Sequence, residues 1–138
     1  MLDLSIIIPI YNEELRLVRS LNILNKYLHQ NINGKLEIIF VSDGSTDKSN
    51  LIIEKFKSEK KRKFNIKFFK YKKNIGKGYA VRKGVLNASN FWILICDIDF
   101  SVHPRQFNNW YNKKLLKSQN KAYYGSREHG LSKVKASK

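Results

Sequence analysis

Short, continuous apolar runs alternate with segments of helical periodicity along this chain, and this alternation constrains the fold more than any other feature. Five runs are predicted to form strands, at residues 4–10, 36–41, 65–71, 91–96 and 121–124. Four segments are predicted to form helices, at about residues 13–30, 48–58, 79–87 and 104–117. Such alternation implies a mainly parallel sheet with right-handed crossovers, and runs without polar residues fit burial on both faces. The predicted class is an α/β fold with three α/β/α layers.

The composition fits one domain with a core, despite a large excess of positive charge. The 138 residues include 27 Lys and Arg against 11 Asp and Glu, a formal net charge of +16, and 42% are hydrophobic. That apolar fraction excludes a chain disordered throughout. We expect one domain over residues 1–127 and a basic irregular tail over 128–138. The charge predicts an anionic partner, such as nucleic acid, an acidic membrane surface or a phosphorylated ligand, although solvated lysines and an AT-rich genome also explain much of it.

The single cysteine and the lack of long apolar segments limit the possible kinds of site and cellular locations. Cys96 is the only cysteine, which excludes an intrachain disulfide and a Cys-cluster metal site. Its place inside an apolar run favours a core role over a nucleophile. No segment approaches the roughly 18–20 apolar residues of a membrane span, and Asp3 stands where a signal peptide carries positive charge. We therefore expect a cytoplasmic protein, with any membrane association peripheral and at the inner face.

Polar residues follow each predicted strand at its carboxyl end, which is where open parallel sheets bind ligands. In chain order they are Tyr11, Asn12 and Glu13; Ser42, Asp43 and Gly44; Lys77 in the 74–78 loop; Asp97 and Asp99; and Arg127. Polar and charged groups at all five positions predict a site for an anionic ligand, together with a divalent metal.

Two short motifs at this edge carry most of the expected chemistry. Asp97 and Asp99 follow an apolar strand and could bind Mg²⁺ or Mn²⁺ through carboxylate oxygens, although such a pair also occurs as cap or loop residues. The segment 76–78 (GKG) departs from both the dinucleotide and the P-loop patterns. One interpretation is a Gly-rich turn that presents Lys77 to a phosphate, with Arg82 one helical turn later. The other is an ordinary surface loop.

Five segments, taken in order, resemble the motifs of family 2 glycosyltransferases of the GT-A fold. They are residues 8–14 (IPIYNEE), 41–47 (VSDGSTD), 74–84 (NIGKGYAVRKG), 97–99 (DID) and 125–127 (GSR). The third and the last resemble the polyprenyl- or dolichyl-phosphate hexosyltransferase branch. The resemblance covers the chain to about residue 127 and implies a nucleotide-binding GT-A fold.

The resemblance also implies an activity and a set of site residues. The activity is transfer of a hexose, with inversion, from a nucleotide-diphosphate sugar to a polyprenyl phosphate or a growing surface glycan, with Mg²⁺ or Mn²⁺ as cofactor. The implied donor-binding residues are Pro9, Tyr11, Glu13, Asp43, Lys77, Arg82 and Asp97. Asp43 would accept a hydrogen bond from the base. Asp97 and Asp99 would be the catalytic carboxylates, with Asp99 on the metal, and Arg127 would contact the acceptor.

The sequence also departs from the family pattern, and two alternatives stay open. Ser42 stands where the family often has an acidic residue, and the family's catalytic domain generally continues beyond the 125–127 motif. We therefore expect a donor-binding part of the GT-A domain, incomplete at its C-terminus and with little or no transferase activity alone. One alternative is a basic nucleic-acid-binding module, which needs aromatic residues among exposed cations. The other is a nucleotidyltransferase, which usually carries glycines directly after the first strand, where this chain has residues 11–13 (YNE).

Overall fold

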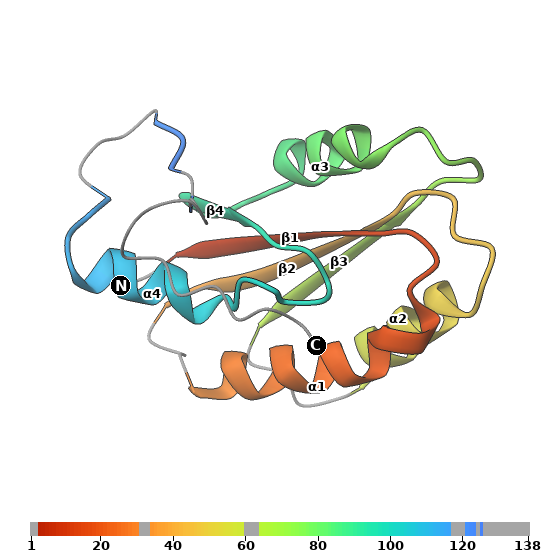
Figure 1. Cartoon of the computed structure of the whole chain (residues 1–138), viewed down its shortest axis with the longest axis horizontal. Coiled ribbons are helices and arrows are strands. Elements are labelled where there is room, and N and C mark those ends of the chain that lie inside the picture. Colours follow the sequence, from red (N-terminus) through yellow and green to blue (C-terminus); the bar gives the residue numbers. More distant parts are fainter. Residues whose placement is uncertain (1–2, 31–33, 60–63, 117–120, 124, 126–138) are drawn as a thin grey trace.

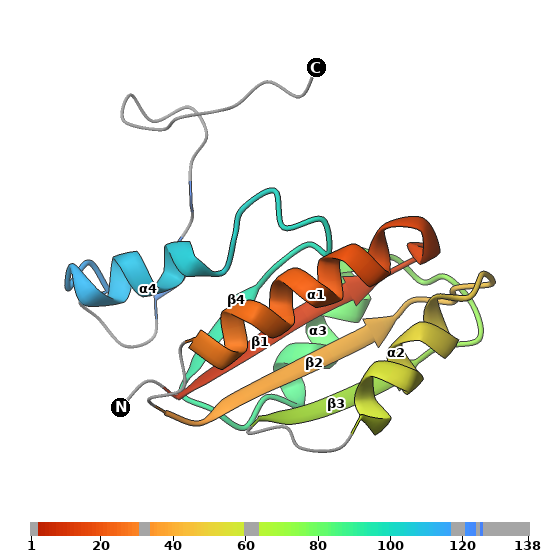
Figure 2. The same cartoon turned by 90° about the horizontal axis from the view of Figure 1, so that it is seen from below.

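The fold is built on a four-stranded, wholly parallel sheet, seen in a computed structural model that describes residues 3–30, 34–59, 64–116, 121–123 and 125. The strands are β1 (Leu4–Ile10), β2 (Leu36–Ser42), β3 (Asn65–Lys70) and β4 (Trp92–Ile95), in the spatial order β3-β2-β1-β4. The helices are α1 (Glu14–Gln30), α2 (Ser49–Ser58), α3 (Lys77–Leu86) and α4 (Arg105–Asn112). Figure 1 shows α1 and α2 on one face of the sheet and α3 on the other, and Figure 2 shows the same layers from below. The predicted α/β class with three layers is confirmed.

The two faces of the sheet pack against their helices in different ways. On the α1 side, the even-numbered positions of β1 and β2, such as Ile6 and Phe40, join one large apolar cluster with the buried face of α1. On the α3 side, Ile7 packs in a smaller cluster with Ala80. The backbone of α3 approaches so closely that a Cβ on Gly84 would lie 2.3 Å from Cγ2 of Ile7. Small residues on α3 therefore let this helix lie directly on the centre of the sheet.

The edge strand β4 is covered on one face only. Trp92 and Leu94 pack against the large cluster on the α1 side. Ile93 and Ile95 pair in register with Ser5 and Ile7, so they point to the α3 side, where they are 39% and 50% exposed. Among the described residues, α3 covers β1 and β2 but leaves this face of β4 open.

The fourth predicted helix ends earlier than its apolar spacing suggests. It stops at Asn112 because Lys114 adopts a left-handed conformation, with φ 55°. The backbone N–H of Lys114 then bonds the Tyr111 carbonyl, and that of Leu115 bonds the Trp110 carbonyl. This pair of bonds is a Schellman motif, which satisfies the last carbonyls of a helix. The end was not visible in the sequence because Gly or Asn usually fills that position, whereas here it is Lys.

The predicted fifth strand was wrong over the part that can be compared. Residues 121–123 form no strand, and residue 124 lies outside the described residues. A strand forms only when it hydrogen-bonds to a neighbouring strand. The short apolar run at residues 121–124 does not by itself determine such a neighbour. The predicted tail, 128–138, also lies outside the described residues. No helix in the described ranges is both long and apolar enough to cross a membrane.

Candidate functional site

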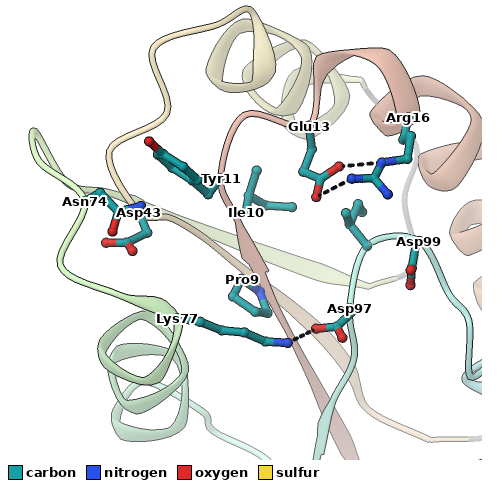
Figure 3. A pocket seen from close by; sticks show the side chains of 11 residues that line it. Pro9, Ile10, Tyr11, Glu13, Arg16, Asp43, Asn74, Lys77, Asp97 and Asp99 are labelled. Atoms are coloured by element: carbon teal, nitrogen blue, oxygen red, sulfur yellow. Dashed lines mark hydrogen bonds and ion pairs between the residues drawn. The ribbon is translucent and has the colours of Figure 1, made fainter.

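A pocket of about 440 Å³ opens beyond the carboxyl ends of β1, β2 and β4, beside the first residue of α3. Its lining, shown in Figure 3, consists of Pro9, Ile10, Tyr11, Glu13, Arg16, Asp43, Asn74, Lys77, Asp97, Ile98 and Asp99. Tyr11, Asp43 and Asn74 lie at one side of the view, while Asp97, Asp99 and Arg16 lie at the other. The pocket therefore has an aromatic and amide side and a strongly charged side.

The wall after β1 is fixed by side chains that bridge the N-termini of α1 and α2. Asn12, in a left-handed conformation with φ 51°, accepts a hydrogen bond from the Thr46 N–H at 2.8 Å. The Glu14 N–H donates to Asp47 at 3.0 Å, and the Lys48 N–H donates back to Glu14 at 2.8 Å. Side chains of one segment thus cap backbone donors of the other, which satisfies groups that a helix start leaves free. The loops after β1 and β2 hold each other in place.

The contacts between these two loops lower the pKa of Asp47. Burial alone would raise the pKa of the Asp47 carboxyl. Hydrogen bonds from the Ser49 hydroxyl and from the Glu14 and Ser49 backbone outweigh that effect and lower the pKa below its ordinary value. These bonds favour the charged form. The carboxylate is therefore a structural cap that stays ionised at neutral pH.

Asp43 holds the loop that follows β3. Its side chain is buried, with one oxygen accepting from the Ile75 N–H at 2.9 Å and the other from the Gly76 N–H at 2.7 Å. The adjacent Gly44, with φ 75°, lies against the same loop, where an added Cβ would be 2.4 Å from the Asn74 nitrogen. Asp43 and Gly44 thereby fix the start of α3. That start places Lys77 in the pocket.

The charged side of the pocket contains two ion pairs. The Lys77 ammonium lies 2.6 Å from Oδ1 of Asp97, and both side chains are more than half exposed. Arg16 donates to Glu13 through Nε at 2.9 Å and Nη2 at 3.2 Å. Asp99 accepts from the Ser101 N–H at 3.0 Å and is otherwise open to solvent. Cations and carboxylates thus share one accessible surface of the pocket.

Comparison with known proteins identifies the family. The profile described as "Glycosyl transferase family 2" matches residues 5–115. The chain belongs to glycosyl transferase family 2. One relative is the dolichyl-phosphate beta-glucosyltransferase of Dictyostelium discoideum, 34% identical over 132 residues, which cover 91% of this chain and 40% of the relative. This chain therefore spans about two fifths of the length of that relative.

Solved structures agree on the fold. The S. aureus TarS 1-349 structure in complex with UDP has a TM-score of 0.59 and 30% identity, over 71% of this chain and 28% of that one. The mannosyltransferase PcManGT from Pyrobaculum calidifontis, in complex with GDP-Man and Mn²⁺, has a TM-score of 0.60 at 20% identity, over 70% of this chain and 27% of that one. The second likeness bears on the fold alone.

Most of the site residues predicted from the sequence of this family 2 chain lie together. Seven line the pocket, namely Pro9, Tyr11, Glu13, Asp43, Lys77, Asp97 and Asp99. Arg82 does not line it, because five helical positions after Lys77 turn its side chain about 140° around the helix axis. Arg127 lies outside the described residues.

The sequence interpretation also missed residues that line the pocket. Arg16 is the clearest, and its signal was available, because it lies one helical turn after Glu13 in the segment that follows β1. Asn74 was seen only as part of a loop. Its position depends on the contact between that loop and Asp43, which no local pattern reveals.

The residues of the pocket suit a divalent metal that is held partly by protein carboxylates and partly by the phosphates of a bound substrate. Among the described residues, no group of three or more His, Cys, Asp or Glu side chains gathers to hold an ion. Mg²⁺ is commonly bound through one or two carboxylates together with substrate phosphates. Asp97 and Asp99 supply two exposed carboxylates on one wall. The Lys77 ammonium pairs with Asp97 on this wall.

Cys96 is excluded as a nucleophile. It is buried in the core at the end of β4. Burial, followed by the nearby Asp97 charge, raises the pKa of its thiol to about 12. The thiolate, which is the reactive form, is therefore negligible at neutral pH. This agrees with the core role expected from the sequence.

Proposed function

We propose that this chain binds the nucleotide-diphosphate sugar donor of a hexosyltransferase, and that the protein transfers the hexose to an acceptor with inversion. The observation that carries the proposal is the pocket itself. Four segments far apart in the family 2 sequence, at residues 9–16, 43, 74–77 and 97–99, supply its lining. The pocket lies at the carboxyl edge of a parallel sheet, which is where such folds bind their ligands.

The two sides of the pocket suit the two parts of a nucleotide sugar. Pro9, Tyr11 and Asp43 form the side that would take the nucleoside, with an aromatic surface for stacking and a carboxylate whose oxygens keep lone pairs free for the base. Lys77 at the N-terminus of α3 would take the diphosphate, since an ammonium and a helix N-terminus both favour anions.

Asp97 and Asp99 are the residues that would hold Mg²⁺ or Mn²⁺. When bound, the metal would offset the negative charge that develops on the departing nucleoside diphosphate. Lys77 would do the same through its own charge. Glu13 holds the Arg16 guanidinium at the charged side of the pocket, where it adds a further positive group.

We infer a polyprenyl phosphate as the acceptor class, with Arg127 as its proposed contact. The support is the similarity to a protein named as a dolichyl-phosphate beta-glucosyltransferase. A phosphate acceptor is already anionic and needs no general base, whereas the hydroxyl of a surface glycan would need one. Such an acceptor is embedded in a lipid bilayer. The proposal therefore places the protein in the cytoplasm, peripherally at the inner face of a membrane whose anionic lipids would attract its net positive charge.

The nucleic-acid alternative is less well supported by the structure. That function needs aromatic side chains exposed among cations. Phe40, Phe56, Phe64, Phe100 and Phe107 are instead buried in the large apolar cluster.

Calorimetry with UDP and GDP, each with and without Mn²⁺, tests the donor proposal. We expect metal-dependent binding of at least one of them, and Asp99→Ala should weaken it about tenfold or more, which is about 1.4 kcal/mol. Glu54→Ala is the matched control, because Glu54 is an exposed carboxylate that pairs with Lys70 outside the pocket. No binding of either nucleotide with either Mn²⁺ or Mg²⁺ would refute the proposal.

A further inference from the structure

The ion pair between Lys77 and Asp97 joins two groups that the proposed function assigns to different ligands. The ammonium lies 2.6 Å from the Asp97 carboxylate, and Figure 3 shows the Lys77 side chain reaching from α3 to Asp97. We propose that Lys77 competes with the divalent cation for Asp97 until a diphosphate draws its ammonium away. Lys77 thereby makes metal binding and diphosphate binding mutually dependent. This inference rests on the proposed donor site.

The pair can exchange because it is exposed. The Lys77 side chain is 62% exposed and that of Asp97 is 53% exposed. An ion pair between groups this accessible to water contributes little to stability, so breaking it costs little. A buried pair would instead be a fixed structural element. Lys77 is therefore poised to leave Asp97 for a stronger partner.

The backbone of Lys77 is held while its side chain remains free to move. Asp43 fixes Ile75 and Gly76, the two residues that precede Lys77, through hydrogen bonds of 2.9 and 2.7 Å. The four-carbon stem of a lysine is flexible, and its ammonium is a compact point charge with rotatable donors. The exchange therefore needs only a change of rotamer, without movement of the rest of the loop.

Because two cations compete for one carboxylate, binding of the diphosphate should strengthen binding of the metal. While Lys77 pairs with Asp97, it occupies a ligand oxygen and repels a second positive charge. A diphosphate carries several negative charges and attracts the ammonium more strongly than one carboxylate does. Once Lys77 has turned to the diphosphate, Asp97 is available to the metal. By linkage, the metal must raise diphosphate affinity by the same factor.

The discriminating experiment measures the two ligands separately in Lys77→Met, which keeps the stem and removes the charge. Free Mn²⁺ is followed by electron paramagnetic resonance, and UDP and GDP are titrated by calorimetry. We expect Lys77→Met to bind Mn²⁺ about 2- to 5-fold more tightly than wild type without a nucleotide, from the usual strength of exposed pairs. The same variant should bind the diphosphate more weakly. A residue that only supported the fold would move both affinities in the same direction.

Two further variants serve as controls. Lys70→Met removes a cation that pairs with Glu54 at 2.7 Å and is 57% exposed, close to the values for Lys77, but it lies outside the pocket. It should leave both affinities unchanged. Lys77→Arg keeps the positive charge and should keep the wild-type Mn²⁺ affinity.

The outcomes separate this inference from the proposed function. If wild type binds Mn²⁺ and a diphosphate but Lys77→Met leaves Mn²⁺ affinity unchanged or lowers it, the competition is refuted and the donor site stands. No measurable Mn²⁺ binding by either protein without a nucleotide would also refute the competition. If wild type binds neither UDP nor GDP with any metal, the proposed function fails as well.

Discussion

Substituting Asp43 by Asn tests whether a buried carboxylate holds the loop that precedes α3. Its two oxygens accept from the Ile75 and Gly76 N–H groups at 2.9 and 2.7 Å, and the residue is 3% exposed. An Asn side chain has one acceptor oxygen, so its NH₂ group must face one of these two donors. A hydrogen bond to a charged acceptor contributes about 1.5–3 kcal/mol, and a buried donor left unpaired costs about 1–3 kcal/mol. Both figures describe the same lost bond, so the expected loss of stability is about 1.5–3 kcal/mol.

Thermal unfolding and amide hydrogen exchange measure this loss globally and locally. At about 4 °C per kcal/mol for a chain of this length, Asp43→Asn should lower the melting temperature by about 6–12 °C. The amides of Ile75 and Gly76 should exchange faster, because local opening becomes easier. Asp97→Asn is the matched control on the same rim, and its exposed ion pair predicts a loss below about 1 kcal/mol. Equal melting temperatures for the two variants, or unchanged exchange at Ile75 and Gly76, would contradict the argument.

Two further predictions concern the packing of α3 and the response to acid. Gly84→Ala should lower stability by about 1–2 kcal/mol in denaturant unfolding, because overpacking against Ile7 exceeds the gain of about 1 kcal/mol in helix propensity. Gly78→Ala, with open space around it, should be neutral or stabilising, and the opposite order would refute the close approach. The lowered pKa of Asp47 means that its stabilisation is present above the unfolded-state pKa of about 4 and is lost as the pH falls through the folded-state pKa. The difference in melting temperature between wild type and Asp47→Asn should therefore be constant above about pH 5 and shrink as the pH falls below about 4. A difference that stays constant down to about pH 2 would show that the charge does not matter.

Most of the architecture was predictable, because apolar runs and helical spacing are local properties. The runs at residues 4–10, 36–41 and 65–71 became β1, β2 and β3 with changes of one residue at most. Helix ends were less predictable, since they depend on single backbone conformations. The left-handed Lys114 ends α4, and Gly76, with φ 115°, starts α3 two residues before its predicted start.

The composition of the candidate site was predictable, but the way its parts act on one another was not. The rule that ligands lie beyond the carboxyl ends of parallel strands located Tyr11, Asp43 and Asp97. It predicted Asp43 as a ligand contact but did not reveal that both of its oxygens also accept from the loop before α3. That contact joins residues more than thirty positions apart, so no local pattern could reveal it. Arg82 was predicted at the site from a motif, but it is not among the residues that line this pocket.

The rim of this pocket is a chain of dependent contacts. Asn12 and Asp47 join the loops after β1 and β2, and Asp43, at the end of β2, holds the loop after β3. Lys77, at the end of that loop, reaches Asp97 after β4. Each loop is thus held by a contact with its neighbour. It follows that a substitution at Asn12, which is about as far along this chain of contacts from Lys77 as the pocket allows, should alter the Lys77–Asp97 ion pair less than one at Asp43. Hydrogen bonds hold the first three loops to one another, and the exposed ion pair at the fourth is the contact that we expect to open when a ligand binds.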